Sequence, residues 1–210
     1  IRRAERILRD WLQSHYPRTT EMFSIDATRE LRKAVVAEYP DQCHDLTFLR
    51  RTVLARMGVA AGYGDALVDP AMDVFDDARN TVDLFPEVRP ALTALRAEYR
   101  LVAVTNGNAN LEKIGIGDLF DEFVSARTAG AAKPARQIFE HAVAAGGVAA
   151  HQTLHVGDHP EYDVNGARDA GLRTAWVNRN GSDWPVGLPE PDAVVSHVGE
   201  LPSLLAAFAR

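Results

Sequence analysis

The sequence has one cysteine, few lysines and no long apolar run, and each shortage narrows the range of functions. Cys43 alone cannot form an internal disulfide, which suits a reducing compartment, and we expect a cytoplasmic protein. No apolar stretch approaches the roughly 20 residues of a transmembrane helix and no secretory signal is visible, so we expect no membrane partner. The formal net charge of -6 offers no basic surface for nucleic acid.

Lysine is scarce because arginine supplies most of the positive charge. Only three of the 23 basic residues are lysines, namely Lys33, Lys113 and Lys133, so each of them merits attention. Composition bias alone can also explain any one of them. The 210 residues, 46% of them hydrophobic, are enough for one core or for one core with a small accessory domain.

The first 80 residues predict helices and no convincing strand. Apolar residues recur at helical spacing over residues 1–12, 31–39 and 71–78. Asp45 is placed to cap a further helix, which we expect to end at Gly58. This part of the chain therefore predicts an all-helical domain.

From residue 81 onward, short apolar runs alternate with helical stretches. The apolar runs cover residues 101–104, 123–126, 153–156, 174–177 and 193–195, and the helical stretches cover 91–99, 135–145 and 161–170. This alternation predicts an α/β fold, with a Rossmann-like parallel sheet and helices on both faces. Such sheets bind ligands beyond the carboxyl ends of their strands, so the residues after each run are the candidate site.

Polar residues follow the first two runs. Thr105, Asn106 and Gly107 can surround an anion with a hydroxyl, an amide and a closely approaching backbone, although Asn-Gly is also a common turn dipeptide. Lys133 precedes Pro134, which we expect in the first turn of the next helix. The lysine either brings a compact cation into the crevice or is a solvated loop residue.

A pair of carboxylates follows the third run. Asp158 comes directly after Gly157, and Asp163 lies five positions further on. Carboxylate oxygens suit a hard cation such as Mg²⁺, but the same residues could end a turn and cap a helix. A dinucleotide-binding site is disfavoured because no G-x-G-x-x-G follows a strand.

The order of hydroxyl, lysine and acid pair resembles the haloacid dehalogenase-like phosphatases. The resemblance rests on their second, third and fourth motifs, seen here as Val104-Thr105-Asn106-Gly107, Lys133-Pro134, and Val156-Gly157-Asp158 with Asp163 and Gly166-Ala167. Within that superfamily, residues 104–109, 115–120 and 44–47 are most similar to the riboflavin-pathway and flavin-mononucleotide phosphatases. The resemblance implies a helical cap over residues 1–80 and a HAD-like core over residues 81–210.

The resemblance also implies an activity and the roles of the site residues. The activity is magnesium-dependent hydrolysis of a small phosphomonoester through an aspartyl-phosphate intermediate, with 5-amino-6-(5-phosphoribitylamino)uracil or flavin mononucleotide as substrate. Thr105, Asn106 and Gly107 would hold the phosphoryl group, and Lys133 would neutralise it. Asp158 would bind Mg²⁺ directly, and Asp163 would support either the metal or Lys133; we assign both to the metal site.

The first motif of that family, an apolar strand that carries the nucleophilic aspartate, is not found in the sequence. Asp26 lacks a preceding apolar strand, and we interpret it as a residue at the start of a helix. We therefore expect about 20 residues, enough for one strand and its loop, to precede residue 1.

Two other functions share the predicted fold. A 2-haloacid dehalogenase-type hydrolase also uses an aspartate nucleophile, but it needs no magnesium and the family's dehalogenases lack the Gly-Asp pair seen at Gly157-Asp158. A non-catalytic binding module without a nucleophile is the other alternative. The presence of Thr105, Lys133 and Asp158 argues against it, because a chain that had lost its activity would not need to keep these residues. The sequence leaves a monomer and a homodimer equally open.

Overall fold

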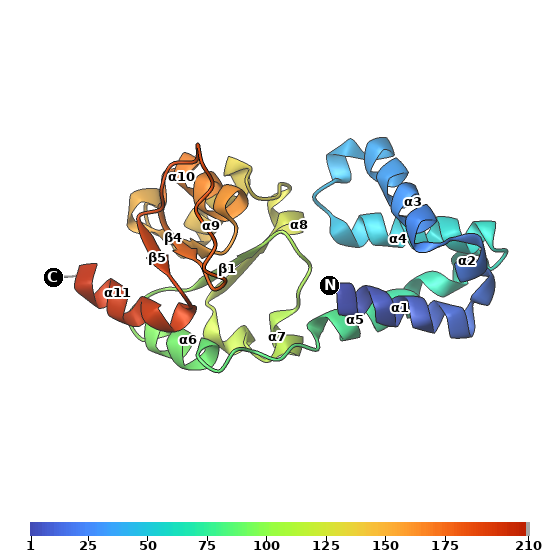
Figure 1. Cartoon of the computed structure of the whole chain (residues 1–210), viewed down its shortest axis with the longest axis horizontal. Helices are drawn as coiled ribbons and strands as arrows, with labels where there is room; N and C mark the ends of the chain where they lie inside the picture. The colour runs from blue at the N-terminus through green and yellow to red at the C-terminus, as the bar shows by residue number, and fades with distance from the viewer. Residues whose placement is uncertain (209–210) are drawn as a thin grey trace. The chain divides into compact units, whose positions relative to one another are not determined.

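The computed structural model describes residues 1–208, so the last two residues of the core predicted over 81–210 lie outside the described residues. The chain forms two compact units (Figure 1). Unit 1 comprises residues 1–82 and 107–114, and unit 2 comprises residues 83–106 and the chain from residue 115 onward. Segment 107–114, which the sequence places in the α/β part, thus groups with the helices of unit 1. None of the described helices is long and apolar enough to cross a membrane.

Unit 1 is built from helices alone. They are α1 (Arg2–His15), α2 (Pro17–Met22), α3 (Ile25–Glu38), the short turns η1 (Pro40–Gln42) and η2 (Gly64–Leu67), α4 (Leu46–Ala60), α5 (Val68–Asn80) and α7 (Leu111–Ile114). Asp45 begins α4 as predicted, because its Oδ1 accepts hydrogen bonds of 2.9 Å from the backbone N–H groups of Thr47 and Phe48. Ser24 caps α3 in the same way, which leaves Asp26 in the first turn.

The expected end of α4 at Gly58 is wrong, because the helix continues to Ala60. Gly58 is needed for a close approach instead. A Cβ atom at this position would lie 2.1 Å from the carbonyl oxygen of Gly64, which belongs to η2. The glycine therefore allows η2 to pack against α4, a tertiary requirement that a sequence pattern does not reveal.

Unit 2 alternates strands and helices. Its strands are β1 (Val102–Thr105), β2 (Glu122–Ser125), β3 (Leu154–Gly157), β4 (Arg173–Val177) and β5 (Ala193–Val195). Its helices are α6 (Val88–Arg96), α8 (Ala126–Ala129), α9 (Arg136–Gly146), α10 (Gly166–Asp169) and α11 (Leu201–Phe208), with the π-helical turn η5 (Pro160–Asn165) and the 3₁₀ turns η3 (Gly117–Leu119), η4 (Ala150–Gln152) and η6 (Val198–Glu200).

The strands pair in parallel, which confirms the predicted α/β fold. β1 pairs with β2, so that Thr105 lies opposite Ser125, and β4 lies between β3 and β5. Among the described residues the sheet is in two pieces, because β1 and β3 do not pair with each other. The break lies between the two strands whose ends carry the candidate site.

Helices cover both faces of the strands. On one face, α9 and α10 pack together over a core that includes Val124, Ile138 and Phe139. On the other face, α6 and α11 lie side by side (Figure 1) and enclose Leu95 and Leu201. Two packed apolar layers around parallel strands form the Rossmann-like arrangement that the sequence predicts.

Two helix boundaries in unit 2 differ from those expected. α9 begins at Arg136, so Pro134 precedes the helix and does not open its first turn. The helix expected over 161–170 instead starts with η5, in which the N–H groups of Asp163 and Val164 both bond to the carbonyl of His159, at 2.9 and 3.3 Å. This wider turn brings the side chain of Asp163 back toward β3.

We expect Gly58→Ala to destabilise unit 1 by about 2 kcal/mol, because the added methyl group overlaps backbone that cannot easily move. Gly146→Ala is the matched control, since its Cβ would meet only Val102 Cγ2 at 3.8 Å, and it should be neutral or slightly stabilising. Urea unfolding of both variants measures the difference. Equal unfolding midpoints for the two variants would contradict the proposal that Gly58 is needed for the close packing of η2 against α4.

Candidate active site

The candidate site lies in unit 2, where β1 and β3 end. Thr105 is the last residue of β1, Gly157 is the last residue of β3, and Asp158 follows directly. Lys133 lies in the segment before α9. Gly107, which the sequence groups with these residues, belongs to unit 1.

Lys133 links β1 to η5, the turn that follows β3. Its Nζ lies 2.7 Å from Asp163 Oδ1 and donates a hydrogen bond of 3.3 Å to the carbonyl of Val104 in β1. The two paired side chains are only 13% and 7% exposed. The alternative of a solvated loop lysine is therefore wrong, and the cation is held where the strands end.

Asn106 fixes the backbone of Lys133. Its Oδ1 accepts a hydrogen bond of 2.6 Å from the N–H of Lys133, and its Nδ2 donates one of 2.8 Å to the carbonyl of the same residue. These two hydrogen bonds hold the backbone of Lys133 in a fixed orientation. Nδ2 carries a second N–H, so the predicted contact of Asn106 with a phosphoryl group stays a prediction.

Asp163 is a buried carboxylate that stays charged. Burial alone would raise its pKa, but the hydrogen bond from His155, the charge of Lys133 and the backbone N–H of His159 together hold the pKa well below its usual range. His155 Nε2 lies 3.5 Å from Oδ1, and the His159 N–H donates to Oδ2 at 3.0 Å. Asp163 lies within η5 and His159 caps that turn, so the alternative of a helix-capping Asp163 is wrong.

Two glycines make this geometry possible. A Cβ atom at Gly157 would lie 2.3 Å from Asp163 Cβ, so only glycine lets β3 approach the buried carboxylate. A Cβ atom at Gly166 would lie 2.9 Å from both Pro134 Cα and Phe139 Cε2. Gly166 therefore lets α10 pack against the segment that presents Lys133.

Asp158 differs from Asp163 because it is exposed. Its backbone is held by Trp176, whose Nε1 donates a hydrogen bond of 3.0 Å to the carbonyl of Asp158. The described residues contain no group of three His, Cys, Asp or Glu side chains that could hold a metal by themselves.

The sequence patterns did not identify three residues that support the site. His155 on β3 contacts Asp163 and packs edge-on against Phe139, with ring centroids 5.1 Å apart. His159 and Trp176 hold Asp163 and Asp158 by the hydrogen bonds described above. A histidine inside an otherwise apolar strand was the available signal for His155, since a buried imidazole needs a polar partner.

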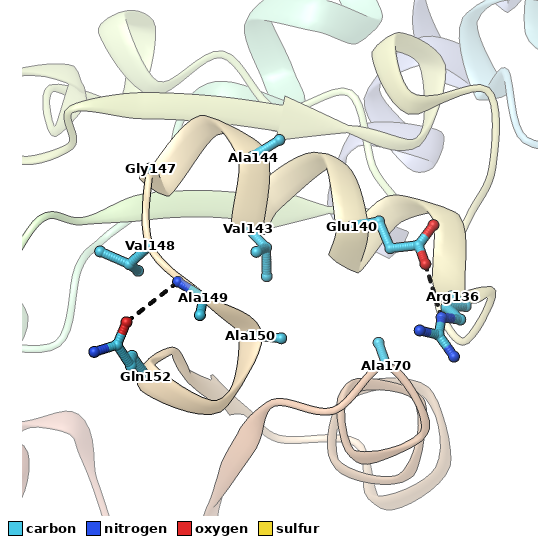
Figure 2. A pocket seen from close by; sticks show the side chains of 10 residues that line it. All are labelled: Arg136, Glu140, Val143, Ala144, Gly147, Val148, Ala149, Ala150, Gln152 and Ala170. Atoms are coloured by element: carbon cyan, nitrogen blue, oxygen red, sulfur yellow. Dashed lines mark hydrogen bonds and ion pairs between the residues drawn. The ribbon is translucent and has the colours of Figure 1, made fainter.

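A pocket on unit 2 contains none of these residues. It is a pocket of about 540 Å³ between α9, η4 and α10, and alanine and valine side chains line most of it (Figure 2). Its charged pair, Arg136 and Glu140, is joined at 2.7 Å and is more than half exposed. The chemistry is therefore assigned to the strand ends and not to this pocket.

We expect Asp163→Asn to cost about 3 kcal/mol of stability at pH 7, because it leaves Lys133 buried without its counter-charge. The folded pKa of Asp163 is below the unfolded value of about 3.9, so the carboxylate contributes fully above that pH and its contribution is lost as pH falls. The difference from the wild type should thus shrink below about pH 4, by at most about 1.4 kcal/mol per pH unit.

Urea unfolding between pH 3 and pH 7 measures this difference. The exposed Asp169→Asn in α10 is the control, and its effect on stability should be small. A difference for Asp163→Asn that stays constant down to pH 3 would contradict a depressed pKa.

The chain is similar to several known hydrolases. Residues 5–171 match a family model described as haloacid dehalogenase-like hydrolase. The 5-amino-6-(5-phospho-D-ribitylamino)uracil phosphatase YigB of Escherichia coli (strain K12) is 32% identical, over 98% of this chain and 89% of its own length. The pyrimidine 5'-nucleotidase YjjG of the same strain is 37% identical, over 54% of this chain and 53% of its own length.

Solved structures show the same fold. A 2-haloacid dehalogenase from Pseudomonas syringae pv. Tomato DC3000 matches with a TM-score of 0.93 and 35% identity, over 98% of this chain and 90% of that chain. A HAD phosphatase from Thermococcus onnurineus matches with a TM-score of 0.69 and 23% identity, over 96% of this chain and 91% of that chain, and it supports the fold alone.

The phosphatases among the relatives support the prediction of a phosphoric monoester hydrolase. The match to the family model covers most of the chain, and the YigB phosphatase aligns over nearly all of it. The chain belongs to the haloacid dehalogenase-like hydrolase family.

Proposed function

We propose that the chain is the larger part of a magnesium-dependent phosphatase that hydrolyses a small-molecule phosphomonoester through an aspartyl-phosphate intermediate. The observation that carries the proposal is the buried cation of Lys133, held against Asp163 beside the exposed carboxylate of Asp158. A fixed positive charge and an exposed carboxylate at the carboxyl edge of the strands suit the transfer of a phosphoryl group, because its transition state spreads negative charge over several oxygens.

Each predicted residue receives a role in this reaction. Thr105 and Asn106 hold the phosphoryl oxygens by O–H and N–H donation, with the backbone at Gly107 in support. Lys133 neutralises both the phosphoryl group and the attacking carboxylate. In each turnover an aspartyl O–P bond forms as the ester P–O bond breaks, and the alcohol leaves with a proton from the second aspartate of the family's first motif. Water then hydrolyses the acyl phosphate, which releases inorganic phosphate and restores the aspartate.

Asp158 would supply a direct ligand to Mg²⁺, because its side chain is exposed where β3 ends. Bound there, the ion would offset the negative charge of the phosphate oxygens. Both oxygens of Asp163 already accept from Lys133, His155 or His159, so we propose that this carboxylate mainly orients Lys133. Its predicted contribution to the metal site stays a prediction.

A further strand between β1 and β3 would complete the site. The support is the break in the sheet, since β1 and β3 carry the site at their ends but do not pair with each other. Lys133 contacts β1 on one side and Asp163 of η5, the turn after β3, on the other. Unpaired backbone inside a sheet is costly, and a strand in this position would satisfy it. The nucleophilic aspartate would lie at the carboxyl end of this strand.

The substrate proposal rests on the relative with the widest alignment. The YigB phosphatase is named for 5-amino-6-(5-phospho-D-ribitylamino)uracil, and we propose this compound or flavin mononucleotide as the substrate class here. The helical segment 1–80 would act as the cap that selects among phosphate esters. The cytoplasmic location and the oligomeric state, monomer or homodimer, stay predictions.

A dehalogenase activity is the second candidate, because a structure titled as a 2-haloacid dehalogenase shares 35% identity with this chain. The same fold hosts both chemistries, so the site must decide between them. The exposed Asp158 after Gly157 favours the phosphatase, since carbon–halogen displacement needs no metal ligand at this position.

We expect Asp158→Asn, made in the complete encoded protein, to lower kcat/KM for phosphate release by about 100-fold or more, because loss of the carboxylate would weaken binding of the Mg²⁺ whose positive charge stabilises the phosphoryl group. Asp169→Asn is the matched control, an exposed aspartate in the nearby helix α10, and it should stay within about twofold of the wild type. Phosphate release from both proposed substrates over a magnesium titration provides the measurement. Magnesium-independent chloride release from 2-chloropropionate, unaffected by Asp158→Asn, would favour the dehalogenase.

The additional strand has its own test. Residues 1–210 alone should release no phosphate, and a chain extended upstream to include an apolar strand and its aspartate should be active. Changing that aspartate to Asn should abolish turnover, because no acyl phosphate can form. Robust magnesium-dependent turnover by residues 1–210 alone would contradict the proposal of an additional strand that carries the nucleophile.

A further inference from the structure

A second cavity lies within unit 1 and shares no residue with the candidate active site. It has a volume of about 260 Å³ and is lined by residues of α1, α2, α3 and α4, including Ile25 and Leu46, the first residues of α3 and α4. Its apolar floor consists of Leu8, Leu12, Leu49, Val53, Leu54 and Met57, all of which belong to the buried core of this unit. The cavity is therefore part of a packed helical unit.

The rest of the lining is strongly cationic. Arg9, Arg29, Arg32 and Arg50 line the cavity and Glu5 is the one acidic residue of the lining, which leaves a formal charge of +3. Two of the four are engaged at the edge, where Arg29 pairs with Asp26 at 2.6 Å and Arg9 donates to the carbonyl of Phe23 at 3.2 Å. The remaining pair, Arg32 and Arg50, shares one carboxylate.

Arg50 is a buried cation with a distant counter-charge. Its side chain is 14% exposed, and the guanidinium lies over the ring of Phe75 at 3.4 Å from the centroid. Within the described residues, the carboxylate that reaches it is that of Glu5, whose Oε1 lies 3.8 Å from Arg50 and 4.0 Å from Arg32. Both distances exceed those of charge-assisted hydrogen bonds, about 2.7–2.9 Å. The adjacent Arg51 pairs with Asp69 at 2.6 Å.

Burial works against this charge. Desolvation, together with the positive charge of Arg32, lowers the pKa of Arg50 to about 10, although Glu5 partly opposes the shift. The guanidinium is thus still protonated at neutral pH but is poorly compensated. An anion in the cavity would supply the hydrogen-bond acceptors that the shared Glu5 carboxylate does not provide at hydrogen-bond distance.

We propose that this cavity is a binding site for a small amphipathic anion, with the apolar body on the leucine-rich floor and a carboxylate or phosphate on Arg50 and Arg32. Planar guanidinium groups bind either head group in a bidentate manner. An apolar cavity of about 150 Å³ holds benzene, so this one accommodates a ligand of roughly ten non-hydrogen atoms. None of the phosphoryl-transfer residues belongs to the lining of this cavity.

Calorimetric titration of the whole chain tests the site with three probes of equal chain length. Octanoate and octyl phosphate carry the two candidate head groups, and 1-octanol is the neutral control. We expect one or both anions to bind at least about tenfold more tightly than 1-octanol, and the tighter of the two assigns the head group. Equal affinity for 1-octanol, or no binding of either anion, would overturn the proposal.

Arg50→Met keeps an apolar stem and removes the charge, and it should weaken binding of the anions by at least about tenfold. Arg51→Met is the matched control from the next position of α4, outside the cavity lining, and it should leave the affinity unchanged. Arg32→Gln, at a half-exposed position, provides a second variant if Arg50→Met does not fold. An equal loss in Arg51→Met would show that general charge, and not the cavity, attracts the anion.

Sedimentation velocity tests whether a second copy of the chain, and not a small molecule, occupies the cavity. If a second copy of the chain fills the cavity, dimerisation should depend on Arg50 and octanoate should neither bind nor dissociate the dimer. That result would overturn the proposal of a small-molecule site. A sedimentation coefficient that is the same with and without octanoate, combined with anion binding, supports it.

Discussion

The buried ion pair between Lys133 and Asp163 is the interaction on which the rest of the α/β unit depends. It lies where two pieces of a parallel sheet end, and the lysine also reaches the backbone of β1 through the carbonyl of Val104. A charge pair in this environment is stable only if its remaining hydrogen-bonding capacity is satisfied. His155 and His159 meet that need for the carboxylate, and Asn106 fixes the backbone that presents the cation. Gly157 and Gly166 provide the space, because a methyl group at either position would collide with this arrangement.

The chain distributes its charges differently in its two units. In unit 2 the buried Lys133 has a carboxylate partner at 2.7 Å, so its charge is compensated and held in one position. In unit 1, Arg32 and Arg50 in the lining of the 260 Å³ cavity share one carboxylate at 3.8–4.0 Å, so their charge is only partly neutralised. Buried cations without close partners are costly, and proteins retain them most readily where a ligand supplies the missing charge.

Membership of the family does not by itself decide the reaction. Phosphatases and dehalogenases are both found among the relatives, and the structure that matches with a TM-score of 0.93 is titled as a dehalogenase. The backbone of the sheet is common to all of them, and chemistry is set by the few side chains beyond the strand ends. In this chain the distinguishing feature is a pair of aspartates in different environments. Asp163 is buried against a cation, and Asp158 is exposed one residue after β3.

The sequence by itself determined the local elements and the order of the chemistry along the chain. Helical periodicity, the Asp45 cap and the alternation of apolar runs with helices depend on neighbours within a few residues, so they could be predicted. The positions of Thr105, Lys133 and Asp158 after successive strands followed from the same local patterns. Only the tertiary structure decided which alternative holds for Lys133 and Asp163, why Gly58 lies inside α4, and that His155 supports the site. The physical reason is that burial, counter-charges and close backbone approaches are made by residues distant in sequence, and a local pattern contains no information about them.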